Sequence, residues 1–141
     1  VAKVLPFGGT DEILGEADFV VLLLPVTSLT RDFINAARLA AMKPTASILN
    51  FARGAVIDQP ALVEALREKR IAAAFLDVTD PEPLPPDDPL WSLDNAHISM
   101  HLSGRSQTLL FARNAERFLE NLGRYGRGDA LESVVDLALG Y

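Results

Sequence analysis

The stretch Ser47-Ile48-Leu49-Asn50-Phe51-Ala52-Arg53-Gly54 joins an apolar run to a charged end. The run follows a Lys-Pro turn and predicts a short buried strand over residues 47–51. Arg53 is charged at physiological pH, and its planar fork of donors can hold a carboxylate or a phosphate by two hydrogen bonds. Gly54 lacks a side chain, so the backbone there can turn sharply or approach a ligand closely. The alternative is that Arg53 begins a surface loop and pairs with a nearby acid.

Similar apolar segments lie on both sides of this stretch, separated by helical patterns. Phe19–Leu24 is a continuous apolar run stopped by Pro25, which is typical of a parallel strand buried on both faces. Two further strands are expected over residues 72–78 and 96–100. Helices are expected over residues 11–17, 35–42, from Asp58 through Lys69-Arg70, and over 105–124, where Gly126-Arg127-Gly128 would break the last one.

This alternation predicts the fold class and part of the core. We expect an α/β fold, a partial Rossmann-like and mostly parallel sheet flanked by helices, with a long C-terminal helix. In that last helix, Phe111, Phe118 and Leu122 recur at helical spacing and are expected to face a core.

Composition excludes several classes of function. The 141 residues are enough for one domain, and 49% hydrophobic with 23% charged residues is a globular composition. A net charge of −6 argues against a nucleic-acid partner. The absence of cysteine excludes disulfides and thiolate metal sites and fits a reducing compartment. Phe19–Leu24, the longest apolar run, is too short to span a bilayer, so we expect a cytoplasmic protein without a membrane partner.

Chemically active side chains follow each predicted strand. Ligands of open parallel sheets bind outside the carboxyl ends of the strands. Those ends carry Pro25-Val26-Thr27, Asn50–Gly54, Asp77 with the acidic, proline-rich segment 79–89, and His101–Gly104. An arginine, an acid and a histidine therefore share one rim, which argues against the surface-loop interpretation of Arg53.

These three side chains suit a substrate that has a carboxylate beside a carbonyl or hydroxyl. Arg53 would bind the carboxylate, and His101 would move a proton to or from the oxygen, since the reference pKa of histidine lies near neutrality. Glu82 would hydrogen-bond the other ring nitrogen, fix the tautomer and favour the imidazolium. Proton transfer at an alcohol oxygen implies that a hydride leaves the same carbon. No side chain accepts a hydride, so a nicotinamide cofactor is implied.

Each of these residues also has a simpler explanation. Glu82 could be a solvated loop charge, Asp77 could cap the following turn, and His101 could be a packed or exposed histidine. His97 would face the same side of a strand as His101, but the His-x-x-x-His spacing suits a helix and no third ligand is evident. We therefore predict no metal site and interpret His97 as structural. The prolines of the acidic loop do not fit a calcium-binding loop either.

In this order the motifs resemble the C-terminal half of the D-isomer-specific 2-hydroxyacid dehydrogenases, the group that includes glyoxylate/hydroxypyruvate reductases and phosphoglycerate dehydrogenases. Leu24-Pro25-Val26-Thr27 resembles the family's Leu-Pro-Leu-Thr segment, and Asn50–Asp58 its arginine motif. Leu76–Pro85 resembles the glutamate motif and His101–Gly104 the histidine motif. The resemblance covers nearly the whole chain. It departs at Ser99-Met100, where the family usually has Thr-Pro, and at Phe51, which is bulkier than usual.

The resemblance implies a role for each motif. Arg53 would bind the substrate carboxylate, and Glu82 with His101 would form the acid/base pair acting on a small 2-keto or 2-hydroxy acid. It also implies a homodimer. Contacts with NAD or NADP would come from Pro25, Phe51, Ala52, Arg53, Asp77, His101 and Gly104.

No G-x-G-x-x-G occurs in the chain, because Gly8-Gly9 and Gly126-x-Gly128 lack the pattern. We therefore expect residues 1–125 to form a partial NAD(P)-binding domain without its first βαβ unit. Residues 126–141 would be a tail that returns to a substrate domain, and the chain would be an inactive fragment that exposes apolar surface. Two other functions stay open: a formate- or phosphite-type dehydrogenase, and a nucleotide-sensing module resembling transcriptional corepressors.

Overall fold

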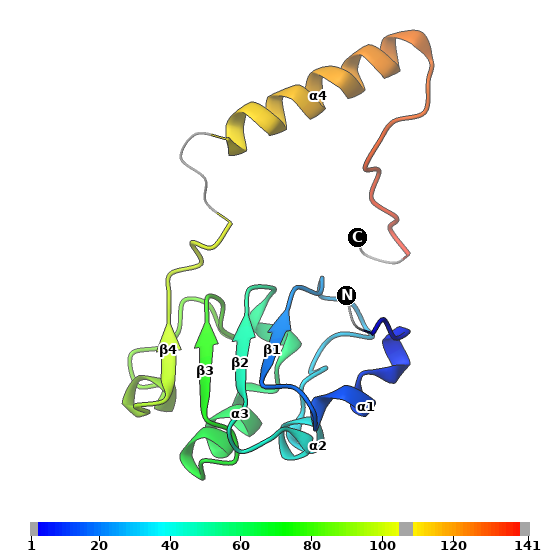
Figure 1. Cartoon of the computed structure of the whole chain (residues 1–141). Helices are drawn as coiled ribbons and strands as arrows, with labels where there is room; N and C mark the ends of the chain where they lie inside the picture. Colours follow the sequence, from blue (N-terminus) through cyan, green and yellow to red (C-terminus); the bar gives the residue numbers. More distant parts are fainter. Residues whose placement is uncertain (1–2, 105–108, 139–141) are drawn as a thin grey trace. The chain divides into compact units, whose positions relative to one another are not determined.

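The computed structural model describes residues 3–104 and 109–138 (Figure 1). The chain divides into two compact units, Val1–His101 and Leu102–Tyr141. The first unit holds the whole sheet, and the second holds one long helix and the segment that follows it.

The first unit is built on a four-stranded sheet in the order β1-β2-β3-β4. The strands are β1 (Phe19–Leu22), β2 (Ser47–Asn50), β3 (Ala73–Leu76) and β4 (Ala96–Ile98). Every neighbouring pair is parallel, which confirms the predicted fold class. Each strand ends earlier than predicted. At the carboxyl edge the chain leaves the ladder and continues as loops. Within β1, for example, pairing stops where Leu22 meets Asn50.

Two α-helices of the first unit begin after a residue whose side chain caps them. In α3 (Gln59–Arg67), the side chain of Asp58 accepts a hydrogen bond from the Ala61 N–H at 3.2 Å, and in α2 (Ala36–Ala41) Asn35 does the same for Arg38 at 3.1 Å. Helix α3 ends before the predicted Arg70, because Lys69 has a φ of 55° that no helix contains. Helix α1 (Asp11–Leu14) is also shorter than predicted. Short 3-10 helices that the sequence did not indicate lie at η1 (Phe7–Gly9), η2 (Gly54–Val56) and η3 (Pro89–Ser92).

One face of the sheet carries the core. The connections β1-α2-β2 and β2-α3-β3 step across the sheet in the same direction, and right-handed crossovers place both helices on the same face. Side chains from both helices and from the strands form one buried cluster, which includes Leu22, Leu39, Ile48, Leu62, Leu66, Ala74 and Leu76.

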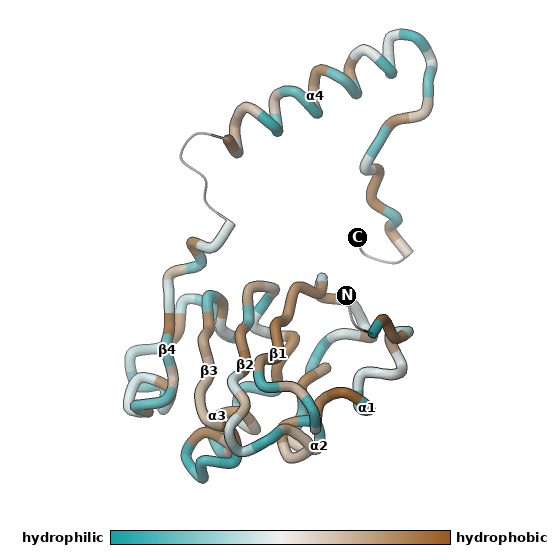
Figure 2. The backbone as a smooth tube through the Cα atoms, in the orientation of Figure 1, coloured by the Kyte–Doolittle hydropathy of each residue, from teal (hydrophilic) through white to brown (hydrophobic). Residues whose placement is uncertain are grey.

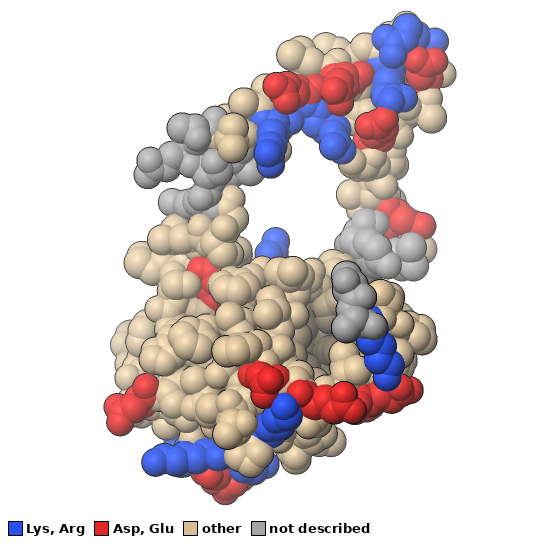
Figure 3. All heavy atoms as spheres, in the orientation of Figure 1, with Lys and Arg blue, Asp and Glu red and all other residues tan. Residues whose placement is uncertain are grey.

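The opposite face is largely exposed in the described part of the chain. Phe19 and Val21 of β1 are 70% and 50% exposed, and Phe75 of β3 is also exposed. The prediction that β1 is buried on both faces is therefore wrong here: β1 is an edge strand with only one covered face. The backbone of the strands is coloured mainly as apolar in Figure 2, and few charged side chains lie over them in Figure 3.

The second unit contains α4 (Leu110–Arg127). The helix continues three residues beyond the predicted Arg124 and ends at Gly128, which has a φ of 73° and caps it in the left-handed conformation, so the predicted break by Gly126-Arg127-Gly128 is confirmed. The first residues of the predicted helix, 105–108, lie outside the described residues. After the helix the chain folds back, and the Asn121 side chain donates to the Glu132 carbonyl at 3.0 Å and accepts from its N–H at 2.9 Å.

The apolar stripe of α4 is exposed. Phe111, Phe118 and Leu122, which were expected to face a core, have exposed fractions of 81%, 65% and 54%. The expectation that this helix exposes apolar surface is met instead. None of the helices among the described residues has the length and apolar character needed to cross a lipid bilayer.

Candidate active site

The side chains predicted from the sequence gather at the carboxyl edge of the sheet, within the first unit. Arg53 follows β2, Asp77 and Glu82 follow β3, and His101 follows β4. Gly104 belongs to the second unit.

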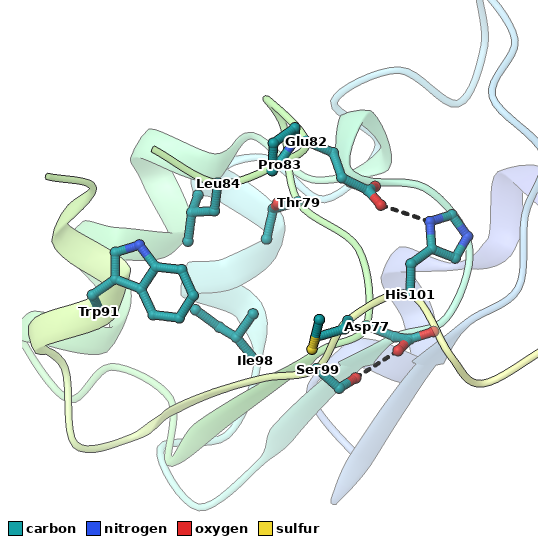
Figure 4. Close-up of a pocket in the computed structure, with 10 residues that line it drawn as sticks. Asp77, Thr79, Glu82, Pro83, Leu84, Trp91, Ile98, Ser99 and His101 are labelled. Carbon is teal, nitrogen blue, oxygen red and sulfur yellow. Dashed lines mark hydrogen bonds and ion pairs between the residues drawn. The ribbon is translucent and has the colours of Figure 1, made fainter. Parts of the chain in front are cut away.

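Glu82 and His101 are in direct contact (Figure 4). The ring Nδ1 of His101 lies 2.7 Å from Oε1 of Glu82, and the two side chains are 42% and 41% exposed. This is the contact that the sequence predicted, and Glu82 is therefore more than a solvated loop charge. With Nδ1 donating to the carboxylate, the ring's Nε2 is left to exchange a proton with a ligand.

The backbone of His101 is in the left-handed region, with a φ of 53°. Its N–H donates to the carbonyl of Asp77 at 2.9 Å, which ties the end of β4 to the end of β3. A non-glycine residue held in this conformation by its neighbours is uncommon and often marks a functional site.

Asp77 is buried, and its carboxylate accepts a hydrogen bond from the Ser99 hydroxyl at 2.5 Å. Ser99 is one of the positions at which the sequence departs from the family pattern, and its hydroxyl makes this bond to Asp77. Asp77 therefore joins two strand ends through its carboxylate and through its carbonyl. Its predicted contact with a cofactor stays a prediction.

Arg53 is exposed, and its Nη1 donates to the carbonyl of Ala52 at 2.7 Å. Among the described residues no carboxylate forms an ion pair with it, which disfavours the interpretation as a surface ion pair. The loop that carries it is fixed by Asn50, a buried residue that the sequence analysis did not single out. Its amide oxygen accepts from the Ala52 N–H and its amide nitrogen donates to the Arg53 carbonyl, each at 3.0 Å.

Gly54 brings the Arg53 loop against the loop that carries Glu82. A Cβ atom added at Gly54 would lie 2.0 Å from the carbonyl oxygen of Thr79. The close approach expected at this glycine is therefore made to the protein's own backbone.

The other predicted cofactor contacts lie on the same edge. The carbonyl of Pro25 accepts a hydrogen bond from Thr30 Oγ1 at 2.6 Å, which fixes the loop after β1. Phe51 is 39% exposed and Ala52 is buried. Phe51 thus presents apolar surface at this edge, and the 141 residues contain no G-x-G-x-x-G turn of the kind that holds a pyrophosphate.

A pocket of about 270 Å³ opens beside the Glu82–His101 pair (Figure 4). Leu84, Trp91 and Ile98 form its apolar wall, and Asp77, Thr79 and Ser99 contribute polar groups. Trp91 donates through Nε1 to the carbonyl of Pro85 at 2.8 Å. The sequence analysis missed Trp91, although it is the only tryptophan in the chain and closely follows the proline-rich segment.

His97 is not part of the pocket. Its ring stacks on Phe75 with the centroids 4.6 Å apart, which supports a structural role. Within residues 3–104 and 109–138 no group of three or more His, Cys, Asp or Glu side chains could hold a metal ion.

Comparison with known proteins gives a consistent result. A protein-family model described as D-isomer specific 2-hydroxyacid dehydrogenase, NAD binding domain, matches residues 2–103. A glyoxylate reductase from Korarchaeum cryptofilum is 42% identical over 126 residues, which are 89% of this chain and 38% of that protein. A D-3-phosphoglycerate dehydrogenase from Methanocaldococcus jannaschii is 39% identical over 127 residues, which are 90% of this chain and 24% of that protein.

Two solved structures are similar in fold as well as in sequence. A D-isomer specific 2-hydroxyacid dehydrogenase from Xanthobacter autotrophicus, in complex with NADPH and MES, has a TM-score of 0.89 at 38% identity and is matched over 96% of this chain and 55% of that chain. An NADPH-dependent glyoxylate/hydroxypyruvate reductase from Sinorhizobium meliloti, in complex with NADP and sulfate, has a TM-score of 0.87 at 30% identity, over 97% of this chain and 44% of that chain. The chain thus spans less than half the length of the two curated relatives.

Proposed function

The chain belongs to the D-isomer-specific 2-hydroxyacid dehydrogenases, and from this premise we propose that the full-length protein reduces a small 2-keto acid with NADH or NADPH, or oxidises the D-2-hydroxy acid in reverse. Glyoxylate and hydroxypyruvate are the substrates proposed first. The observation that carries the proposal is the contact of Glu82 with Nδ1 of His101 at the edge where ligands of parallel sheets bind.

In the reduction, three side chains of this chain act on the substrate or on one another. Arg53 binds the carboxylate with two hydrogen bonds, and its five N–H donors allow this while Nη1 keeps its bond to the carbonyl of Ala52. His101 donates a proton from Nε2 to the carbonyl oxygen as that oxygen gains charge. Glu82 holds the ring through Nδ1 and stabilises the imidazolium that donates the proton. The nicotinamide, when bound, supplies the hydride that reaches the carbonyl carbon.

The proposed cofactor contacts at the carboxyl edge are Pro25, Phe51, Ala52, Arg53, Asp77 and His101, and Gly104 of the second unit is proposed from the family resemblance alone. They suit the nicotinamide end of a dinucleotide, because they combine apolar surface with the polar groups of Asp77 and of the backbone. The pyrophosphate would require a glycine-rich turn that these 141 residues do not contain.

We also propose that the full-length enzyme is a homodimer and acts in the cytoplasm. The open apolar face of the sheet, with Phe19, Val21 and Phe75 exposed, supports an interface of some kind. Light scattering on the full-length protein gives the number of subunits, and a monomer at micromolar concentration would contradict the dimer.

The relatives reported above are named glyoxylate reductase, glyoxylate/hydroxypyruvate reductase and D-3-phosphoglycerate dehydrogenase, which favours this proposal over a nucleotide-sensing module. The test is oxidation of NADH and NADPH by the full-length protein with glyoxylate and with hydroxypyruvate. We expect His101→Gln to lower kcat by about 10²-fold or more, the usual size of acid/base catalysis.

The matched control is His97→Gln, which changes the other histidine of the chain and should leave the kinetics unchanged because His97 stacks on Phe75 and does not line the pocket. Full-length protein that binds NADH but reduces no 2-keto acid would contradict the proposed function. A fully active His101→Gln variant would contradict the assignment of the proton donor.

A further inference from the structure

The segment 80–88, which carries Glu82, is held at both of its ends by one side chain. Gln59 is the first residue of α3 and is half-buried. Its amide oxygen accepts a hydrogen bond from the N–H of Asp80 at 3.0 Å, and its amide nitrogen donates to Oδ2 of Asp88 at 3.1 Å. Because an amide group is planar and rigid, these two bonds fix the two ends of the segment relative to each other.

The segment depends on such bonds because its prolines have no N–H to donate. Other hydrogen bonds that hold the segment, among described residues, include Thr79 Oγ1 to the carbonyl of Pro81 at 3.0 Å and the Asp88 N–H to the carbonyl of Pro85 at 3.1 Å. The pair Arg31–Asp80 is 4.0 Å long with both side chains more than half exposed, so it contributes little.

Further hydrogen bonds connect Asp88 to the wall of the pocket. The other oxygen of Asp88, Oδ1, accepts from the Leu90 N–H at 2.9 Å and so caps η3. Trp91, in η3, donates to the carbonyl of Pro85 and so connects η3 back to the segment. One network therefore joins the start of α3 to the residues on both sides of Glu82.

Helix α3 itself does not need this side chain. Its first turn is capped by Asp58, whose carboxylate accepts from the Ala61 N–H. The side-chain amide of Gln59 is therefore not needed to cap its own helix, and the two hydrogen bonds described above join it to the segment 80–88.

We propose that Gln59 is a positioning residue: it sets the place of Glu82 and, through Glu82, the ring of His101, without touching the substrate. The catalytic consequence rests on the proposed function, whereas the effect on the segment 80–88 does not.

The sharpest test exchanges the two partners in the full-length protein. Gln59→Glu places a carboxylate against that of Asp88, and the repulsion should displace the segment. We expect kcat for 2-keto acid reduction to fall about 10-fold or more, because small displacements of catalytic groups are costly, while KM changes less than about twofold because Arg53 is untouched. Adding Asp88→Asn restores the pair with its polarity reversed, since the introduced amide donates to the introduced carboxylate, and should recover most of kcat.

A second comparison separates positioning from general damage. If Gln59 acts through Glu82, the double variant Gln59→Leu/Glu82→Gln should lose no more kcat than Glu82→Gln alone. Glu64→Gln, on the exposed side of the same helix, is the matched control and should behave as wild type. Losses that multiply in the double variant would overturn the proposal, as would a Gln59→Glu variant with wild-type kcat or one that Asp88→Asn fails to rescue.

Hydrogen exchange keeps this test separate from that of the enzyme's function. Gln59→Glu should speed amide exchange in peptides covering residues 79–88, Asp88→Asn should restore it, and exchange in α3 should stay unchanged. If the protein reduces no 2-keto acid but exchange changes in this way, the proposed function fails and the structural part of the inference stands. Unchanged exchange at 79–88 would overturn the inference whatever the activity.

Discussion

At the scale of single residues, the backbone of His101 makes a measurable prediction. A side chain in the left-handed region costs about 1–2 kcal/mol, and glycine avoids that cost. We therefore expect His101→Gly to be more stable than His101→Ala by about 1 kcal/mol, although glycine usually destabilises. Both variants lose the ring and its bond to Glu82, so their difference isolates the backbone. Denaturant unfolding of the two full-length variants measures it, and greater stability of the alanine variant would contradict the conformation of His101.

Asn50 provides a second prediction at this scale. It is 1% exposed, and both groups of its amide are used to hold Ala52 and Arg53. Asn50→Leu leaves those backbone groups unpaired, so the Arg53 loop should shift and KM for the 2-keto acid should rise about 10-fold, with a loss of about 2 kcal/mol in unfolding free energy.

Asn95→Leu is the control for Asn50→Leu. The Asn95 amide donates to the carbonyl of Leu66, and it lies at the opposite end of the sheet from Arg53. This variant should lose stability without a change in KM. Equal effects of the two variants on KM would show that the change at Asn50 acts through stability and leaves the Arg53 loop in place.

At the scale of elements, Gly54 joins two loops that the proposed mechanism requires to be close. A methyl group there would overlap the carbonyl of Thr79, and backbone cannot move aside as a side chain can. We expect Gly54→Ala to destabilise the protein by about 3 kcal/mol and to lower kcat/KM, because the Arg53 loop and the Glu82 loop must separate. Gly126→Ala, where nothing lies within 4 Å of the added atom, should be neutral or slightly stabilising. A Gly54→Ala variant with normal melting temperature and kinetics would contradict the contact.

The elements also show which features of this fold can be predicted from the sequence. The parallel direction of β1, β2 and β3 follows from the alternation of apolar runs and capped helices, and the contact of Glu82 with His101 follows from both lying at carboxyl ends. The residues at which the strands end could not be predicted, because side-chain hydrogen bonds such as those of Asn50 decide where the ladder stops. The segment that packs against Gly54 could not be predicted either, because a glycine permits close packing but does not show which part of the chain packs against it.

At the scale of the whole molecule, apolar periodicity in a sequence indicates that one face of a helix or strand is apolar, but it does not show what covers that face. Phe118 and Leu122 were expected in a core for that reason, and both are exposed, as are Phe19 and Val21 on the open face of the sheet. Each unit therefore carries an apolar surface of its own, larger than a single scattered side chain would provide.

We expect the 141-residue chain, produced alone, to self-associate through these surfaces and to show no turnover of 2-keto acid. Phe118→Lys/Leu122→Lys on α4 and Phe19→Lys/Val21→Lys on β1 should each shift the species toward monomer in light scattering, and the size of each shift ranks the two surfaces. Glu120→Lys adds positive charge to α4 without removing apolar area and should leave association unchanged. A monodisperse monomer that binds no hydrophobic dye would contradict the exposure of both faces, and measurable hydroxypyruvate reduction by this chain would contradict its dependence on a glycine-rich turn outside these residues.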